Sequence, residues 1–140
     1  MALQGKLLIA GNEYNVLECD YEFYQPYDNN YKPSAYVEGG LINFTLNSVN
    51  HDDNFFHDWM MNTWDPKSGE FRFPIMDKDR APKWKNMSFK RAHCIRLSES
   101  FSELNERHML MKITICAPII DFGGSAKFRN KDIINDVIFD

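Results

Sequence analysis

Strict alternation of apolar and polar side chains recurs along the chain and constrains the fold more than any other feature. The clearest run is 109–120, where apolar side chains take every second position: Met111, Ile113, Ile115 and Ala117. A second run alternates apolar with amide or hydroxyl side chains: Ile42, Phe44 and Leu46 against Asn43, Thr45 and Asn47. A period of two marks strands of an antiparallel sheet with one wet face. The chain is therefore expected to be mainly β.

Further strands are expected at 6–10, 13–24, 35–49, 71–75 and 85–97. Gly11-Asn12 suits a tight hairpin turn, and Gly39-Gly40 suggests a kink in the middle of 35–49. Breaks in the alternation at Val16-Leu17 and within 89–92 predict bulges. The segment 98–108 is expected to be a polar connection anchored by Phe101 and Leu104. Short bulged strands of this kind favour a small antiparallel β-barrel or a tight sandwich.

One segment, 54–64, has the period of a helix instead. Its apolar side chains fall on one half of the circumference and are expected to form a core helix face: Phe55, Phe56, Trp59, Met60 and Trp64. Asp52 and Asp53 are placed to cap its start, and the run 65–69, with Pro66 and Gly69, stops it. One helix packed on the sheet is the expectation.

The length of 140 residues predicts a single domain, 1–140, that folds without disulfides or metal. Its tail, 125–140, fits a last strand or a short helix, and we favour the strand. The net charge of −4 argues against a nucleic-acid binder, and no apolar run is long enough for membrane insertion. The start of the chain lacks the apolar run of a secretory signal, which predicts cytoplasmic synthesis.

Three cysteines, Cys19, Cys94 and Cys116, lie within apolar runs and have no C-x-x-C pairing. A redox pair and a metal-ligand set are the functional alternatives. Three reduced, buried thiols are the favoured interpretation.

The sequence contains no sign of an enzyme. Neither G-x-S-x-G, nor a P-loop, nor a G-x-G-x-x-G run occurs. His51, Asp52, Asp53 and His57 are the nearest approach to a metal cluster, but helix capping accounts for both aspartates. We therefore expect no catalytic residue, no metal and no cofactor.

A basic segment, 78–91, stands out in an acidic chain. It holds Lys78, Arg80, Lys83, Lys85, Lys90 and Arg91, with Trp84 in the middle. Basic residues beside an aromatic can bind single-stranded nucleic acid. A solvated loop or a protein contact patch is the favoured interpretation, and because the rest of the chain carries an acidic excess, the patch suits a contact with the acidic surface of a second copy.

The order of these elements resembles a known family. The resemblance is carried by Leu3-Gln4-Gly5-Lys6-Leu7-Leu8-Ile9, by Val37-Glu38-Gly39-Gly40-Leu41-Ile42, by the helix with Trp59, and by Met87-Ser88-Phe89-Lys90-Arg91-Ala92-His93-Cys94. Together they resemble the Hcp (TssD) tube proteins of type VI secretion systems, in the branch found in Bacteroidota. The similarity extends to about Gly124. The chain departs from the family pattern at Leu97, where an aromatic residue is expected, and in the tail from Ser125.

The resemblance implies a small β-barrel with one flanking helix, similar to phage tail-tube proteins. It implies homohexameric rings that stack into a tube inside a contractile sheath, with a spike and secreted effectors as partners. Export through the machine itself would then follow cytoplasmic synthesis. The alternative function is a monomeric β-barrel binding module for a small ligand or peptide.

Two polar loops are the expected ring-stacking or subunit-interface segments, because the loops of a barrel project from its ends. The expected contact residues are Tyr27, Asn29, Asn30, Tyr31 and Lys32 in one loop and Lys78, Arg80, Lys83, Trp84 and Lys85 in the other.

Overall fold

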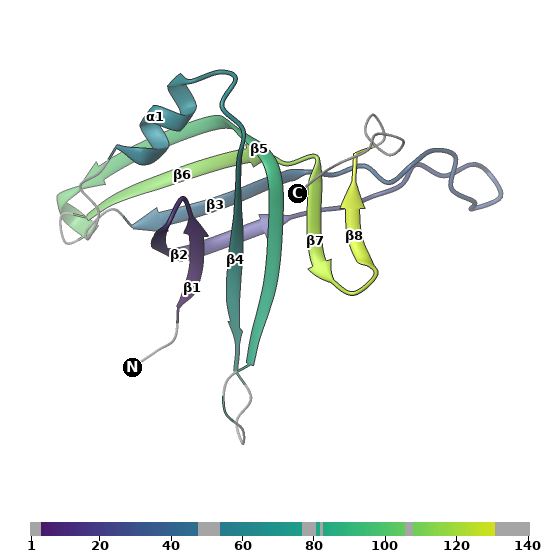
Figure 1. Ribbon diagram of the computed structural model, residues 1–140, viewed down its shortest axis with the longest axis horizontal. Helices are drawn as coiled ribbons and strands as arrows, with labels where there is room; N and C mark the ends of the chain where they lie inside the picture. Colours follow the sequence, from purple (N-terminus) through teal and green to yellow (C-terminus); the bar gives the residue numbers. More distant parts are fainter. Residues whose placement is uncertain (1–3, 48–53, 77–80, 82, 106–107, 131–140) are drawn as a thin grey trace.

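A closed antiparallel β-barrel is the main feature of the computed structural model, which describes residues 4–47, 54–76, 81, 83–105 and 108–130 (Figure 1). Six strands form it: β1 (Gly5–Ile9), β2 (Asn12–Tyr21), β3 (Leu41–Asn47), β4 (Lys67–Ile75), β5 (Lys83–Ser102) and β6 (His108–Cys116). They follow one another in the order β4-β1-β2-β3-β6-β5, and pairing of β4 with β5 closes the barrel. The predicted fold class, mainly β with one helix and a small antiparallel barrel, is confirmed.

Strand β5 closes the barrel because it changes partner along its length. Its first half pairs with β4, from Lys83 opposite Ile75 to Ala92 opposite Lys67, and its second half pairs with β6. Arg91 lies between the halves with a φ of 59°, and the ladder to β4 shifts register there, as the predicted bulge requires. The Arg91 backbone N–H donates to Ser68 Oγ at 3.3 Å.

The first hairpin turns at Ala10-Gly11, one residue earlier than predicted. Ile9 pairs with Asn12, and the two residues between them have φ of 52° and 78°. Two successive positive φ values define the type I′ turn that matches strand twist. The predicted bulge at Val16-Leu17 is confirmed, since the β2–β3 register shifts between Val16 and Glu18.

The barrel interior is filled by side chains from every strand. The inward positions with almost no exposure include Leu7, Tyr14, Ile42, Phe71, Met87, Phe89, Ile113 and Ile115. Helix α1 (Phe55–Met61) packs on this core through Phe56 and Trp59, both buried, with Phe55 and Met60 partly buried beside them. The Trp59 indole Nε1 donates to the backbone oxygen of Asp65 at 2.9 Å, so its one polar atom is satisfied.

Trp64 does not belong to this core face, and the prediction was wrong for it. The helix ends at Met61 because Asn62 adopts an extended conformation, so positions beyond it leave the helical period. The Trp64 side chain is 87% exposed. Asp52 and Asp53, the predicted caps, lie outside the described residues, and Asn54 at the start makes no capping side-chain bond.

The predicted strand 109–120 is divided at Ala117-Pro118 into β6 and β7 (Ile119–Gly123). Strand β7 continues along β5 and forms a hairpin with β8 (Ala126–Arg129). Strand β8 lies at the start of the tail, whereas the apolar residues on which the expected last strand rested, within 133–139, lie outside the described residues, so that prediction is untested. The expected connection 98–108 was also wrong in part: β5 extends to Ser102, and Phe101 and Leu104 are exposed rather than anchored.

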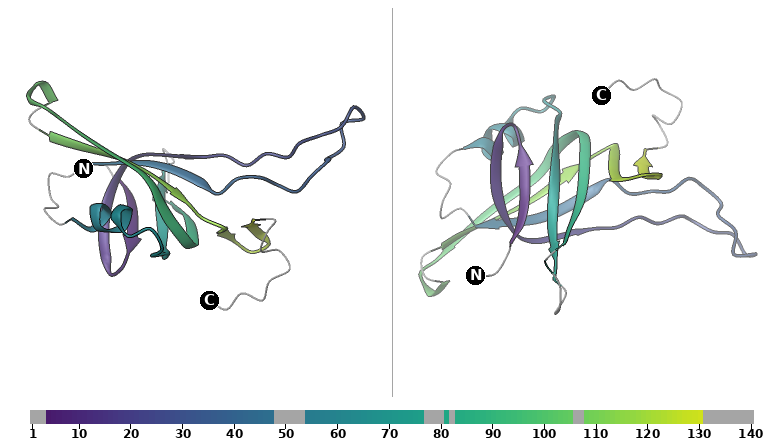
Figure 2. Two further views of the ribbon diagram at one scale, coloured as in Figure 1. Left: turned by 90° about the horizontal axis from the view of Figure 1, so that it is seen from above. Right: turned by 60° about the horizontal axis from the view of Figure 1, so that its bottom comes forward.

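Gly40 lies where the chain enters β3, and not within a strand as predicted. Residues 22–40 leave the barrel as a protruding arm, so β3 begins only at Leu41 (Figure 2). Gly40 has a φ of 103°, and a Cβ built on it would come 2.7 Å from the carbonyl oxygen of Ala117. The Gly40 carbonyl in turn accepts the Ala117 N–H at 2.7 Å, which joins the arm base to β6.

The cysteines differ in exposure. Cys94 is buried, Cys19 is partly buried, and Cys116 is exposed, so the prediction of three buried thiols was wrong for Cys116. Cys116 follows inward-facing Ile115 and therefore points outward. Burial raises the pKa of Cys19 to about 12, with a smaller contribution from the Asp20 carboxylate. Burial also raises the pKa of Cys94, to about 11.

Replacing Gly40 by alanine should destabilise the fold more than the same change at Gly123. Gly123 has a similar φ of 99°, but a methyl group added there would meet no atom within 4 Å, so Gly123→Ala carries the backbone strain alone. That strain costs roughly 1–2 kcal/mol, and the clash at Gly40 adds roughly 1–3 kcal/mol. Urea unfolding measures both, and equal losses in the two variants would contradict the close approach at Ala117.

In the native protein, a thiol reagent at about pH 8 should modify Cys116 well before Cys19 and Cys94. Denatured protein should yield three free thiols per chain. Equal reaction rates at all three thiols of the native protein would refute the assigned burial.

The stability of the protein should also depend on pH through the two less accessible cysteines. The folded state holds Cys19 and Cys94 as neutral thiols above 9.0, the ordinary pKa of a cysteine, so the free energy of unfolding should fall as pH rises from 9 toward 12.

Candidate assembly surfaces

The arm, residues 22–40, is the most protruding feature of the described structure (Figures 1 and 2). Its two sides are joined near the barrel by paired backbone bonds, Tyr24 N–H to Glu38 O at 3.0 Å and Glu38 N–H to Tyr24 O at 2.7 Å. The Tyr24 hydroxyl also donates to Glu38 Oε2 at 2.7 Å, and this bond is the main cause that raises the pKa of Tyr24. Apart from Phe23, which packs against the core, the arm is therefore ordered by local polar bonds.

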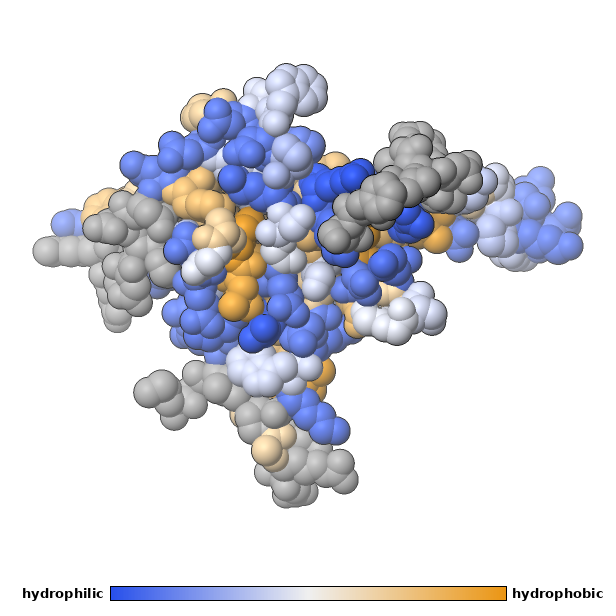
Figure 3. All heavy atoms as spheres, in the orientation of Figure 1, coloured by the Kyte–Doolittle hydropathy of each residue, from blue (hydrophilic) through white to orange (hydrophobic). Residues whose placement is uncertain are grey.

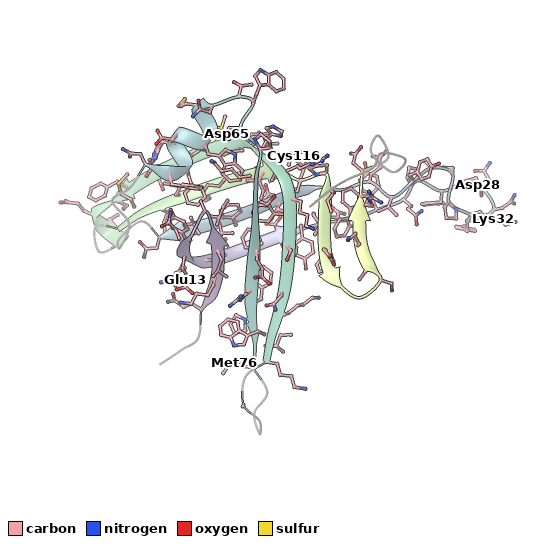
Figure 4. The ribbon with its side chains drawn as sticks, in the orientation of Figure 1. Glu13, Asp28, Lys32, Asp65, Met76 and Cys116 are labelled. Carbon is pink, nitrogen blue, oxygen red and sulfur yellow. The ribbon has the colours of Figure 1, made fainter. Side chains whose placement is uncertain are left out.

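Asp28 organises the tip of the arm. Its carboxylate accepts the backbone N–H groups of Asn30 and Lys32 at 2.8 and 3.1 Å, and its own N–H donates to Lys32 O at 2.9 Å. Tyr31 takes a left-handed φ of 63° to complete the turn. Asp28 and Lys32 mark this extremity in Figure 4, and hydrophilic atoms cover it in Figure 3. Local Asx-type bonding explains how an exposed tip holds one shape.

The predicted loop residues Tyr27 and Tyr31 are exposed and stacked on each other. Their ring centroids lie 6.0 Å apart at an interplanar angle of 16°. The two residues are 69% and 86% exposed, far more than a tyrosine needs to keep its hydroxyl in water. Exposed aromatics on a shaped protrusion are typical of a protein–protein contact. Asn29 and Asn30 lie in the same turn.

The second predicted segment ends the β4–β5 hairpin, at a different extremity of the barrel, near Met76 in Figure 4. Lys83 and Trp84 are exposed there, while the Lys85 Nζ lies over the ring of Phe122, 5.7 Å from its centroid. Lys78 and Arg80 lie outside the described residues. The structure therefore separates the two predicted contact segments and ties Lys85 to β7.

An acidic hollow lies at the base of the arm. Its volume is about 430 Å³, and three carboxylates line it: Asp20, Glu22 and Glu38. Among the described residues that line it, none is a lysine or an arginine. Sequence reasoning missed this surface because Asp20 and Glu38 are 18 positions apart and meet only when the arm folds back. Part of the acidic excess predicted from the sequence is thus gathered in one hollow.

A polar lane crosses the outer face of β2, β3 and β6. Asn43 Nδ2 donates to Asp20 Oδ1 at 3.0 Å, and the Thr114 hydroxyl donates to Asn43 Oδ1 at 2.6 Å. A shallow hollow lies beside these hydrogen bonds. Acidic and basic side chains both line it, including Glu18, Arg96 and Lys112. The alternation of Asn43 and Thr45 predicted this solvent-facing side of β3. No pattern in the sequence predicted which side chains of β2, β5 and β6 lie beside it.

Several exposed apolar side chains lie on elements away from the arm (Figure 1). They lie at the end of α1, in the residues that follow it, and at the outer end of the β5–β6 hairpin: Met61, Trp64, Phe101, Leu104 and Met109. His57 on α1 joins these elements through its Nε2 contact with Glu99 on β5. Helical and strand periods assigned several of these residues to the core, so no pattern in the sequence could mark them as surface.

Chemical sites are not evident in the part of the chain that the structure describes. Within the described ranges, no group of three His, Cys, Asp or Glu residues could hold a metal ion. Among the same residues, no helix is long and apolar enough to cross a membrane.

Comparisons with known proteins agree with this geometry. The family model of the hemolysin coregulated protein Hcp (TssD) matches residues 1–131. Hcp1 from Flavobacterium johnsoniae is 28% identical and superposes with a TM-score of 0.76, over 91% of this chain and 100% of that chain. No curated protein matches the sequence.

More distant structures share the fold. Hcp3 from Pseudomonas aeruginosa, a secreted protein, is 9% identical with a TM-score of 0.65, over 93% of this chain and 99% of its own. A sheath/tube terminator of an extracellular contractile injection system, PVC, is 12% identical with a TM-score of 0.54, over 89% and 96%. With a barrel, a flanking helix and a family model that matches residues 1–131, the chain belongs to the Hcp (TssD) family.

Proposed function

We propose that this protein is a structural tube subunit of a contractile injection system, that it closes into hexameric rings, and that these rings stack into a tube that carries effectors. The family match over residues 1–131 carries the proposal. The match to a sheath/tube terminator supports a place inside a contractile sheath, and a spike at the tip of the tube belongs to the same proposal. Cytoplasmic synthesis followed by export through the machine belongs to the same proposal, as does the lack of an enzymatic role.

The filled barrel supports a structural role over the alternative of a monomeric binding module. Inward residues such as Leu7, Phe71 and Ile115 are 0% exposed, so the barrel interior is core and not a ligand chamber. In small barrels the interior is filled by side chains in this way, whereas ligand-binding barrels are wider. The exposed aromatic residues instead lie at the extremities, where copies of the chain can meet.

We assign the arm to the ring-to-ring contact. The stacked pair Tyr27 and Tyr31 offers apolar contact area on a protrusion that already has one shape, so little conformational entropy is lost on docking. The basic end of the β4–β5 hairpin, Lys83 with Trp84, complements the acidic hollow lined by Asp20, Glu22 and Glu38. We assign the polar lane around Asn43 and Thr114 to the wet lumen, because its exposed side chains are polar and bonded to one another.

The purified protein should have a native mass of six times the 16.5 kDa of one chain. A closed ring gains every interface, whereas an open arc leaves two unpaired surfaces. Light scattering and native mass spectrometry measure this mass. A monomer at tens of micromolar would refute the ring and favour the binding module.

Changing the arm tip should stop stacking without unfolding the protein. Tyr27→Ser with Tyr31→Ser removes two exposed rings, so the free energy of unfolding should change by less than about 0.5 kcal/mol. Electron microscopy should then show single rings where the unchanged protein forms tubes. Tubes of unchanged length would exclude the arm tip from the stacking contact.

A charge reversal tests the basic hairpin in the same assay. Lys83→Glu with Lys85→Glu should leave the ring intact and shorten tubes, and added salt should shorten the tubes of the unchanged protein, because the screening length is only about 10 Å at 0.1 M. The matched control is Arg96→Glu with Lys112→Glu, which reverses the same charge beside the polar lane. If the control shortens tubes equally, net charge and not this contact governs stacking.

A further inference from the structure

An apolar groove of about 500 Å³ lies between the base of the arm and the β7–β8 hairpin. Phe23 from the arm meets Phe122 and Phe128 from the hairpin, with ring centroids 6.0 and 5.1 Å from its own. These three rings form a continuous aromatic floor. Tyr36 and Val37 stand on the arm side, 62% and 38% exposed. An apolar hollow of this kind on a surface marks a contact site.

The chain itself leads into this groove. Strand β8 supplies the other wall through Lys127, Phe128 and Arg129, and the Asn130 N–H donates to Pro118 O at 2.8 Å directly after it. Ten residues, 131–140, follow Asn130 in the sequence. Three residues of extended chain span roughly 10 Å at most, so the first apolar residue of this segment, Ile133, can reach the groove.

The composition of the segment matches that of the groove. Its apolar residues are Ile133, Ile134, Val137, Ile138 and Phe139, and its acidic residues are Asp132, Asp136 and Asp140, against one basic residue, Lys131. Among the described residues, the charged side chains that line the groove are basic, Lys127 and Arg129, and Lys127 also pairs with Asp121, with its Nζ 3.6 Å from Asp121 Oδ2. Apolar area and charge are therefore complementary on the two sides.

The family does not account for this segment. The match to the Hcp (TssD) family ends at residue 131, and Hcp1 from Flavobacterium johnsoniae is covered completely while 91% of this chain is matched. An occupant formed by 131–140 is therefore a property of this chain and is separate from the shared barrel.

We propose that the chain's own C-terminal segment, 131–140, docks in this groove, with its apolar side chains on the floor of Phe23, Phe122 and Phe128. Attachment to β8 holds the segment at a millimolar effective concentration, so its own groove is favoured over that of a neighbour. Docking removes five apolar side chains and an aromatic surface from water at once. The proposal does not depend on the tube function.

Photo-crosslinking of the full chain tests it. A benzophenone amino acid replaces Ile134, and mass spectrometry of the irradiated protein locates the adducts. They are expected on peptides that contain Phe23, 35–37 and 126–129 of the same chain. The matched control carries the probe at Leu104, which is 96% exposed at the far end of the β5–β6 hairpin and should label none of these peptides.

A mixture of isotope-labelled and unlabelled chains separates the possible occupants. Adducts within one chain support the proposal, whereas mixed-label adducts in the groove assign it to a neighbouring subunit and overturn it. Adducts confined to other surfaces overturn it as well.

A truncated variant gives a second, independent measurement. Deleting 132–140 should speed amide exchange in 35–38 and 126–129 by roughly tenfold, while exchange in β3 stays unchanged. Unchanged exchange along the groove overturns the proposal, and the native mass of the same variant reports separately on the ring.

Discussion

Pairing of β4 with β5 is the interaction on which the rest of the structure depends. Without it, the order β4-β1-β2-β3-β6-β5 would be an open sheet with β4 as an unpaired edge. Closure needs β5 to serve two partners, and the bulge at Arg91 gives the strand the change of direction that this requires. Once the barrel is closed, buried inward side chains fill its interior, and α1 packs on this core through Phe56 and Trp59. The arm and the β7–β8 hairpin are additions to that closed body.

Much of this fold follows from alternation alone. The inward positions of β3 and β6, such as Phe44 and Ile113, were predicted because one face of each strand is wet and the other is dry. Trp59 and Phe56 were predicted from the helical period for the same reason. Local chemistry also located the first hairpin to within one residue, since few turns other than type I′ fit two tightly paired strands.

Other features depend on contacts between distant segments, which periodicity does not report. Trp64 continues the helical pattern but follows the last helical turn, because the backbone at Asn62 departs from it. The residues just before Gly40 were predicted to belong to the strand 35–49, yet they form one side of the arm, where Glu38 exchanges backbone hydrogen bonds with Tyr24 on the other side. The acidic hollow joins Asp20 and Glu38 across the arm base. The contact segments predicted from their loop character stay proposals, and the structure places them at separate extremities.

The break at Ala117-Pro118 has a consequence for misfolding. Next to the break, β6 and β7 keep one register against β5, with Cys116 opposite His93 and Ile119 opposite Lys90, and the register of β6 shifts only farther along, between Cys94 and Arg96. The opposite edge changes its neighbour at the break, because β6 pairs there with β3 and β7 pairs with β8. A slip by one residue would turn the apolar side chains of β6 toward water and would also move Pro118, which has no N–H to donate, into a position that needs a donor. Two unrelated penalties thus oppose the same error, and the longest pairing in the molecule is protected against slippage and strand exchange between copies.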